Sequence, residues 1–180
     1  MVYLFLAEGF EIIEALTPVD VLRRGHVDVK TVGIGSNQIK SSHGITVTTD
    51  ITIDEISSWN DAEAVILPGG MPGTKKLEAN TAVIEAVKFC IEHDRIIGAI
   101  CAAPSILGHL GVLKDKKATA FPSFQQELEG AVLSEDYVVA DGKIVTARGM
   151  GVSLPFGLKL LELLKDSEIA LAVKLSVQCP

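Results

Sequence analysis

The stretch that decides the fold is RIIGAICAAPSILG, residues 95–108, because two patterns meet in it at Cys101. Before the cysteine, residues 96–100 form a short apolar run that is typical of a buried strand. After it, apolar residues recur at helical spacing over residues 106–110. Pro104 suits the first turn of that helix, where its missing N–H would have no partner. The pattern therefore predicts a sharp strand-to-helix turn that carries Cys101.

Cys101 is a candidate nucleophile because of the place that this turn gives it. The start of a helix has unsatisfied N–H groups and the positive end of the helix dipole. Both are expected to lower the pKa of a thiol and to offer donors to an oxyanion. A buried structural cysteine is the alternative, since cysteine is among the most buried residue types. The small neighbours Ala99, Ala102 and Ala103 favour a reactive cysteine, because a tight turn and a close substrate require small side chains.

Strand and helix signals alternate along the rest of the chain. Strands are predicted over residues 2–7, 27–34, 62–70 and 96–100. Helices are predicted over residues 10–24, 78–93 and 152–164, directly after Cys101, and in the tail over residues 172–177. Hairpins are predicted over residues 39–53 and 137–147, with turns near His43-Gly44 and at Asp141-Gly142. Alternation of this kind, with nearly continuous apolar strands, is typical of an α/β fold whose mostly parallel sheet is covered by helices on both faces. Ligands of such folds bind at the carboxyl ends of the strands, where the loops 8–14 and 68–74 and Cys101 are expected.

The composition indicates a single globular domain over residues 1–180, with 48% apolar and 22% charged residues. The net charge of −7 and the absence of a basic run argue against nucleic-acid binding. The first residues, MVYLFLAEGF, lack a basic region and reach Glu8 at once, which favours a first strand over a signal peptide. No stretch approaches the length of a membrane span.

Three cysteines, Cys90, Cys101 and Cys179, are widely spaced and lack the pairing of metal ligands. Their odd number argues against a disulfide framework, so a reducing cytoplasm is the expected compartment. Cys90 lies on the apolar side of its predicted helix and is expected to be inert. Cys179, beside the C-terminus, is expected to be exposed and disordered.

Glu14 is the second candidate for chemistry. It lies in FEIIEALTPVDVL, residues 10–22, among apolar neighbours. Pro18 removes the helical partner of the Glu14 carbonyl, so the helix is expected to kink or break there. A carboxyl in an apolar setting has a raised pKa and can stay protonated, so that it donates a hydrogen bond to a thiolate. A solvated helix face, shared with Glu11 one turn earlier, is the alternative.

Gly69 and Gly70 follow a buried strand in the segment ILPGGMPG, residues 66–73. Their backbone N–H groups can approach a bound oxygen without a side-chain clash. An ordinary turn is the alternative, since such dipeptides are common in loops. The segment is not a phosphate-binding loop, because no Gly-Lys-Ser/Thr sequence follows it.

Four segments together resemble the ThiJ/PfpI superfamily, in the branch of the Parkinson-disease protein deglycase and bacterial YajL-type proteins. They are AEGFEIIEALTPVDVLRR, VILPGG, GAICAAPSIL and TARGMG, spread over the whole chain in the order of the family. The resemblance implies a flavodoxin-like three-layer α/β/α sandwich, related to the class I glutamine amidotransferase domain and usually homodimeric.

The resemblance also implies roles for particular residues. Cys101 matches the oxidation-sensitive nucleophile, and Glu14 matches the protonated acid that hydrogen-bonds it. The backbone N–H groups of Gly69, Gly70 and Ala102 match donors of oxyanion type. Arg24 and His43 fall where the family often places basic residues for a substrate or anion. In the deglycase the second is an arginine from the partner subunit, so the histidine is a departure. No cofactor and no metal are implied.

Phe121, in the segment TAFPSF, is a larger departure, because some members carry a histidine there. Nucleophilic hydrolysis by a cysteine usually requires a Cys–His pair, so an intracellular peptidase is disfavoured. YajL-type relatives also carry phenylalanine at this place. Arg148, in the segment TARGMG, is expected to brace the structure rather than to act in catalysis.

Two functions of different classes are compatible with these residues. The first is a cysteine-dependent enzyme of deglycase or glyoxalase type, acting on methylglyoxal or on glycated protein. The second is a redox sensor or stress chaperone in which Cys101 is oxidised to a sulfinate. A role in thiamine-precursor metabolism is a weaker alternative, which rests on the family name only.

Overall fold

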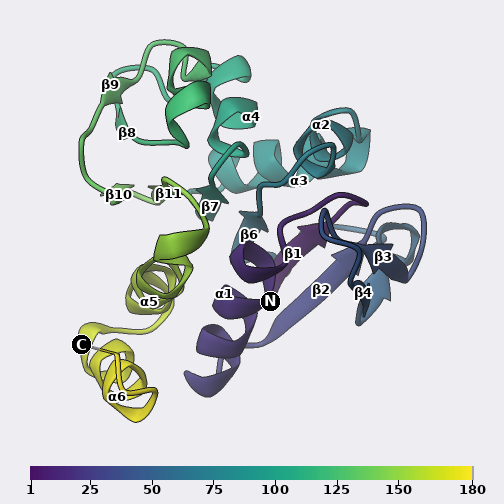
Figure 1. Cartoon of the computed structure of the whole chain (residues 1–180), viewed down its shortest axis with the longest axis horizontal. Coiled ribbons are helices and arrows are strands. Elements are labelled where there is room, and N and C mark those ends of the chain that lie inside the picture. Colours follow the sequence, from purple (N-terminus) through teal and green to yellow (C-terminus); the bar gives the residue numbers. More distant parts are fainter. Residues whose placement is uncertain (180) are drawn as a thin grey trace.

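The chain folds around a central sheet that helices cover on both faces (Figure 1). The computed structural model describes residues 1–179. Its main strands are β1 (Val2–Leu6), β2 (Val29–Gly33), β5 (Ile51–Thr52), β6 (Ala64–Leu67), β7 (Ile96–Ile100), β10 (Val138–Asp141) and β11 (Ile144–Ala147). Within the described residues they form one seven-stranded sheet in the order β10-β11-β7-β6-β1-β2-β5. All neighbours in it pair in parallel except β10 and β11, so the predicted mostly parallel sheet is confirmed.

The helices form the two outer layers. Helices α1 (Ile12–Arg24) and α5 (Ser153–Leu164) lie side by side on one face, and α6 (Ser167–Ser176) packs against α5. Helices α2 (Gly73–Glu78), α3 (Thr81–Glu92) and α4 (Pro104–His109) lie on the opposite side of the sheet (Figure 1). This arrangement is the predicted three-layer α/β/α sandwich of flavodoxin-like type.

The side chains of β1 show why both faces must be covered. Tyr3 and Phe5 belong to a core that includes residues of α3 and α4. Val2, Leu4 and Leu6 point the other way, into a core with α1 and α5. All five are at most 5% exposed, and alternate residues of a strand point to opposite faces. A strand that is apolar at every position is therefore stable only between two helical layers.

Several short elements complete the described part. They are the hairpin strands β3 (Gln38–Lys40) and β4 (Thr46–Thr48), the two-residue strands β8 (Lys117–Ala118) and β9 (Val132–Leu133), and the 3-10 helices η1 (Ile53–Glu55), η2 (Pro122–Glu127) and η3 (Met150–Val152). The predicted turn near His43-Gly44 is confirmed, and so is the hairpin of β10 and β11. Strand β5 leaves the first hairpin and pairs with β2.

Helix α1 continues through Pro18 from Ile12 to Arg24, so the expected break at this proline is wrong. A proline removes only its own N–H from the helical ladder, and the turns before and after it keep their hydrogen bonds. Pro18 is itself buried on the face of α1 that turns toward the core. Packing of this face therefore holds the helix together across the missing hydrogen bond.

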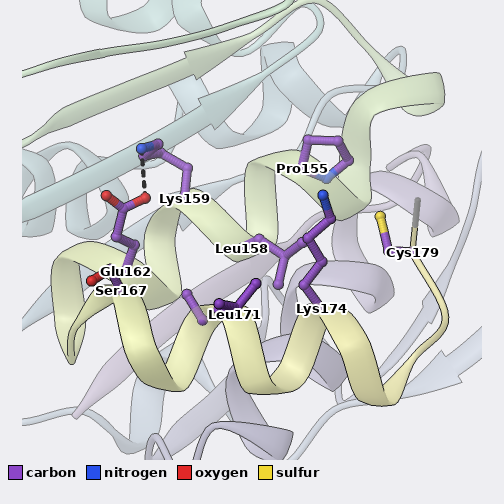
Figure 2. Close-up of a pocket in the computed structure, with 9 residues that line it drawn as sticks. Pro155, Leu158, Lys159, Glu162, Ser167, Leu171, Lys174 and Cys179 are labelled. Atoms are coloured by element: carbon purple, nitrogen blue, oxygen red, sulfur yellow. Dashed lines mark hydrogen bonds and ion pairs between the residues drawn. The ribbon is translucent and has the colours of Figure 1, made fainter.

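Helix α6 is longer than the predicted tail helix and forms a groove with α5. Figure 2 shows Leu158 of α5, Leu171 and Lys174 of α6, and Cys179 around this groove of about 360 Å³. Cys179 is half-buried there, so its expected exposure is wrong. In residues 1–179, no helix combines the length and apolar character needed to cross a bilayer.

Candidate active site

The predicted strand-to-helix turn is present, and it places Cys101 in an uncommon conformation. The φ angle of Cys101 is 64°, in the left-handed region that few residues other than glycine adopt. Two backbone hydrogen bonds fix the turn: Cys101 N–H to the oxygen of Ala147 at 2.9 Å, and Phe121 N–H to the oxygen of Cys101 at 2.9 Å. The neighbouring loops therefore hold the half-buried thiol in one direction.

The carboxyl of Glu14 lies directly beside this thiol. Glu14 is only 1% exposed, which excludes a solvated helix face. The Cys101 thiol hydrogen-bonds this carboxyl, and the N–H groups of Gly69 and Met150 donate to it as well, the former to Oε2 at 3.0 Å. The predicted contact between the two residues is therefore present, although they are far apart in the chain.

Gly69 has a different role from the predicted one. Its N–H donates to the buried carboxyl of Glu14, so it is not available to an oxygen of the substrate. A Cβ atom at this position would lie 2.6 Å from Oε2 of Glu14 and 2.7 Å from Cβ of Cys101. Only glycine permits so close an approach. Gly69 is therefore a support for Glu14, and the prediction of an oxyanion donor at Gly69 is corrected.

Gly70 and Ala102 remain as donors at the sulfur. The N–H groups of both residues hydrogen-bond Cys101, and both favour its charged form. Gly70 has a φ of 92°, and a Cβ atom there would lie 2.4 Å from the backbone nitrogen of Glu11. The two N–H groups converge on one sulfur from different loops. An oxygen that develops negative charge beside this sulfur can accept from the same groups.

Burial, and for the thiol also the charge of Glu14, govern the protonation of the pair. Burial is the main cause that raises the pKa of the Glu14 carboxyl to about 7. Burial, the charge of Glu14 and the hydrogen bond to Glu14 raise the pKa of the Cys101 thiol to about 12. The expectation that this turn lowers the thiol pKa is therefore wrong, because the helix terminus is outweighed by burial and a carboxylate neighbour. Near pH 7 the pair therefore consists of a thiol and a carboxyl that is about half ionised and can accept its proton.

A pocket of about 310 Å³ opens around the pair. The hairpin of β3 and β4 brings His43 to it, as expected from the sequence. Nδ1 of His43 lies 3.1 Å from Oγ of Ser42 and 3.5 Å from Oε2 of Glu11. The imidazole is therefore held by a second carboxyl of the same pocket. The sequence analysis missed Glu11 and Ser42, although Glu11 shares a helix face with Glu14 and Ser42 precedes the histidine.

Arg24 does not belong to this pocket, so its predicted place near the site is wrong. Its Nε pairs with Oδ2 of Asp20 at 2.7 Å on the exposed side of α1. Arg24 lies ten residues beyond Glu14 on the same helix, which is about 15 Å along the axis. The guanidinium of Arg24 therefore lies at the end of α1 that is remote from the pocket.

Phe121 lines the pocket, where some relatives were expected to have a histidine. The hydrogen-bond partner of the thiol is thus a carboxyl, not an imidazole. Of the other cysteines, Cys90 is fully buried in the core, as predicted. Within residues 1–179, no group of three or more His, Cys, Asp or Glu side chains is placed to hold a metal ion.

Comparison with known proteins identifies relatives over most of the chain. The model of the DJ-1/PfpI family matches residues 1–163. Protein DJ-1alpha of Drosophila melanogaster is 34% identical over 170 residues, which are 93% of this chain and 78% of that protein. A Caenorhabditis elegans protein named glutathione-independent glyoxalase DJR-1.2 is 29% identical over 162 residues, 89% of this chain and 86% of its own length.

The structure of oxidized DJ-1 from Toxoplasma gondii has a TM-score of 0.93 and 30% identity, covering 98% of this chain and 97% of that one. The similarity therefore extends over both the sheet and the loops that build the pocket. Since the family pattern spans 163 of the 180 residues, the chain belongs to the DJ-1/PfpI family.

Proposed function

We propose that the protein is a cofactor-independent enzyme of glyoxalase or deglycase type that acts on methylglyoxal or its protein adducts through Cys101. One observation carries the proposal: a half-buried thiol contacts a carboxyl whose pKa is about 7, while two backbone N–H groups reach the same sulfur. A family member that bears the name of a glutathione-independent glyoxalase supports this class of reaction.

The first step is addition of the sulfur to the aldehyde carbon. Glu14 takes the thiol proton while the C–S bond forms, and the electron pair of the carbonyl moves to its oxygen. The N–H groups of Gly70 and Ala102 stabilise the charge on that oxygen. Glu14 then returns a proton to the oxygen, which leaves a hemithioacetal on Cys101.

The second step is an internal oxidation and reduction. A proton leaves the former aldehyde carbon and one reaches the former keto carbon through an enediol, so that the first carbon becomes a thioester and the second a carbinol. Glu14 is the base within reach of the sulfur-bound carbon. Water then cleaves the thioester, which releases lactate and restores the thiol. Atoms and electrons balance without an external oxidant.

The test is lactate formation from methylglyoxal by the wild type and by Cys101→Ala. We expect the variant to lose at least a hundredfold in kcat/KM, because no other group of the pocket can form the C–S bond. Cys179→Ala, which removes a thiol in the groove of α5 and α6, is the matched control and should keep its rate. Equal rates for wild type and Cys101→Ala would refute the proposal.

A redox-sensing or chaperone function is the second candidate, and the accessibility of one cysteine favours it. Cys101 is partly exposed, whereas Cys90 is fully buried. Two peroxide molecules would convert the Cys101 sulfur first to a sulfenate and then to a sulfinate, each releasing one water. The N–H groups of Gly70 and Ala102 would then donate hydrogen bonds to the new oxygens. After peroxide treatment, mass spectrometry should find Cys101 oxidised first, and earlier oxidation of Cys90 would contradict this function.

We also propose a homodimer in the cytoplasm. Ile13 and Ile45 are 45% and 52% exposed, and a second copy would cover such apolar surface. Light scattering after size exclusion should give twice the mass of the chain, and a monomeric mass would contradict the dimer. The compartment rests on the number and spacing of the cysteines, and fractionation of cells tests it. The described residues contain no feature that supports thiamine-precursor metabolism.

A further inference from the structure

A second cavity adjoins the pocket of the reactive cysteine. It has a volume of about 480 Å³. Its lining is mostly apolar and includes Phe121, Pro122, Tyr137, Arg148, Met150 and Val152. The mechanism proposed above uses none of these side chains, so the cavity needs its own explanation.

The two cavities share a wall. Phe121 and Met150 line both of them. Gly149 lies between the two cavities. A Cβ atom at Gly149 would lie 3.5 Å from Cδ2 of Phe121 and 3.9 Å from Sγ of Cys101. The backbone of Gly149 and two partly exposed side chains therefore separate the reactive sulfur from the second cavity. A substrate whose carbonyl carbon reaches Cys101 can extend past this wall.

The lining of the second cavity suits a flat apolar group. Phe121, Tyr137 and Met150 are 46%, 62% and 54% exposed, so three large side chains present carbon surface to solvent at one place. Clustered exposure of this kind usually marks a binding surface. The aromatic rings favour a second ring, because ring pairs add binding free energy beyond the area that they bury.

Arg148 stabilises this lining rather than offering an unpaired charge. Its guanidinium lies 5.2 Å from the centre of the Tyr137 ring, within the range of a cation–π contact. Nη2 bonds Oε2 of Glu135 at 3.0 Å, and Nε bonds Oγ1 of Thr119 at 3.4 Å. Because Glu135 neutralises the guanidinium, the cavity has no unpaired charge from this residue to attract an anion. The expectation that Arg148 is a brace agrees with these contacts.

We propose that this cavity is the substituent site of the enzyme and that the preferred substrate is a 2-oxoaldehyde bearing an aromatic group. The inference rests on the function proposed above. The dicarbonyl end lies at Cys101, and the ring lies between Phe121 and Tyr137. Phe121 therefore has a role of its own at the place where some family members carry a histidine: it forms the wall that the substrate ring contacts.

Atoms and electrons balance in the same way when the substrate is phenylglyoxal. In phenylglyoxal the aldehyde carbon becomes a carboxylate and the keto carbon becomes a carbinol, so that one water is consumed and mandelate is formed. No oxidant, reductant or cofactor enters. The aromatic ring takes no part in bond making, so its contribution is binding and positioning only.

The kinetic test compares phenylglyoxal with methylglyoxal in initial rates, after subtraction of the rate of Cys101→Ala. We expect kcat/KM for phenylglyoxal to exceed that for methylglyoxal by roughly tenfold, and Tyr137→Ala to abolish this ratio. Tyr137→Phe, which keeps the ring, should retain the ratio. Leu133→Ala, which removes an exposed apolar side chain of β9, is the control. If Tyr137→Ala leaves the ratio unchanged, the substituent site is refuted.

A binding measurement keeps this inference separate from the proposed function. The Cys101→Ala protein, which cannot form the C–S bond, is titrated with mandelate and with lactate by calorimetry. We expect mandelate to bind roughly tenfold more tightly, and Tyr137→Ala in the same background to remove the difference. Equal affinities would overturn the substituent site even if methylglyoxal is turned over. A preference for mandelate without any turnover would support the site and contradict the enzyme.

Discussion

Replacement of Glu14 by glutamine isolates the role of its carboxyl as a base. Glutamine has nearly the same shape, and its amide oxygen can still accept the N–H of Gly69, which is 3.0 Å from Oε2 in the wild type. The amide cannot take a proton from Cys101. Glu14→Gln therefore removes the proton acceptor while it leaves the support of the site in place.

The expected magnitude follows from the two pKa values. In the wild type, the pKa of Glu14 is about 7, so the carboxylate that accepts the thiol proton is half formed at that pH. Without the carboxylate, the pKa of Cys101 should fall from about 12, because the charge and hydrogen bond of Glu14 no longer oppose ionisation, but burial, the largest cause of the shift, remains and keeps this pKa above its ordinary value of 9.0. A thiol with such a pKa is less than about 1% ionised at pH 7. The rate at pH 7 should therefore fall by at least roughly a hundredfold, within the usual contribution of a general base.

The assay is the pH dependence of kcat/KM for methylglyoxal between pH 5 and pH 10. The wild type should show a rise centred near pH 7, where Glu14 ionises, without thiolate absorbance at that pH. Glu14→Gln should show a rise centred above pH 9, which the thiolate absorbance follows. Glu162→Gln, which changes an ion-paired carboxylate on α5, should keep the wild-type midpoint. A Glu14→Gln profile that keeps both the rate and the midpoint of the wild type would refute the assignment of Glu14 as the base.

Two further predictions concern the packing and the charges around the site. Gly69→Ala places a Cβ atom 2.6 Å from Oε2 of Glu14, so we expect a loss of about 1–3 kcal/mol in stability and of most activity. Thermal unfolding measures the first, and Gly151→Ala, with no atom within 4 Å of its new Cβ, should melt as the wild type does. The pKa of His109 is raised by its hydrogen bond to Glu78, at 2.6 Å. Because the folded pKa exceeds the unfolded one, this contribution is complete below about pH 6.5 and is lost as pH rises through the folded pKa. The stability difference between wild type and His109→Gln should therefore shrink between pH 6 and pH 9, and a growing difference would contradict the ion pair.

Much of the fold was predictable because its elements carry strong local patterns. The strand before Cys101 is apolar at every position and short, and it is followed at once by a proline and small residues. These features determine both the buried parallel strand and the turn, whose positive φ the structure then shows. Helix α2 was missed, because its short segment GTKKLE has little apolar periodicity between a proline and the next helix. The strands β8 and β9 have two residues each, too few for an alternating pattern.

The residues of the site could be predicted from the sequence better than the contacts between them. Cys101 and Glu14 were identified as a pair and the raised pKa of Glu14 was predicted, whereas the raised pKa of Cys101 was not. Arg24 was wrongly placed near the site, because the family resemblance gives its position in the sequence but not the end of the helix at which its side chain lies. Gly69 was given the wrong partner, since a backbone N–H can donate to a ligand or to a buried carboxyl. Such choices depend on distances between segments far apart in the chain.

The contacts explain how a carboxyl can replace the usual imidazole beside a reactive cysteine. A base works best when its pKa is near the working pH, and histidine meets this condition without help. Glu14 meets it only because burial raises its pKa to about 7, and a buried carboxylate in turn needs donors such as the N–H of Gly69. That donor can approach only where residue 69 has no side chain. Residue 121 then needs no side chain that transfers a proton, so Phe121 can form an apolar wall of the pocket.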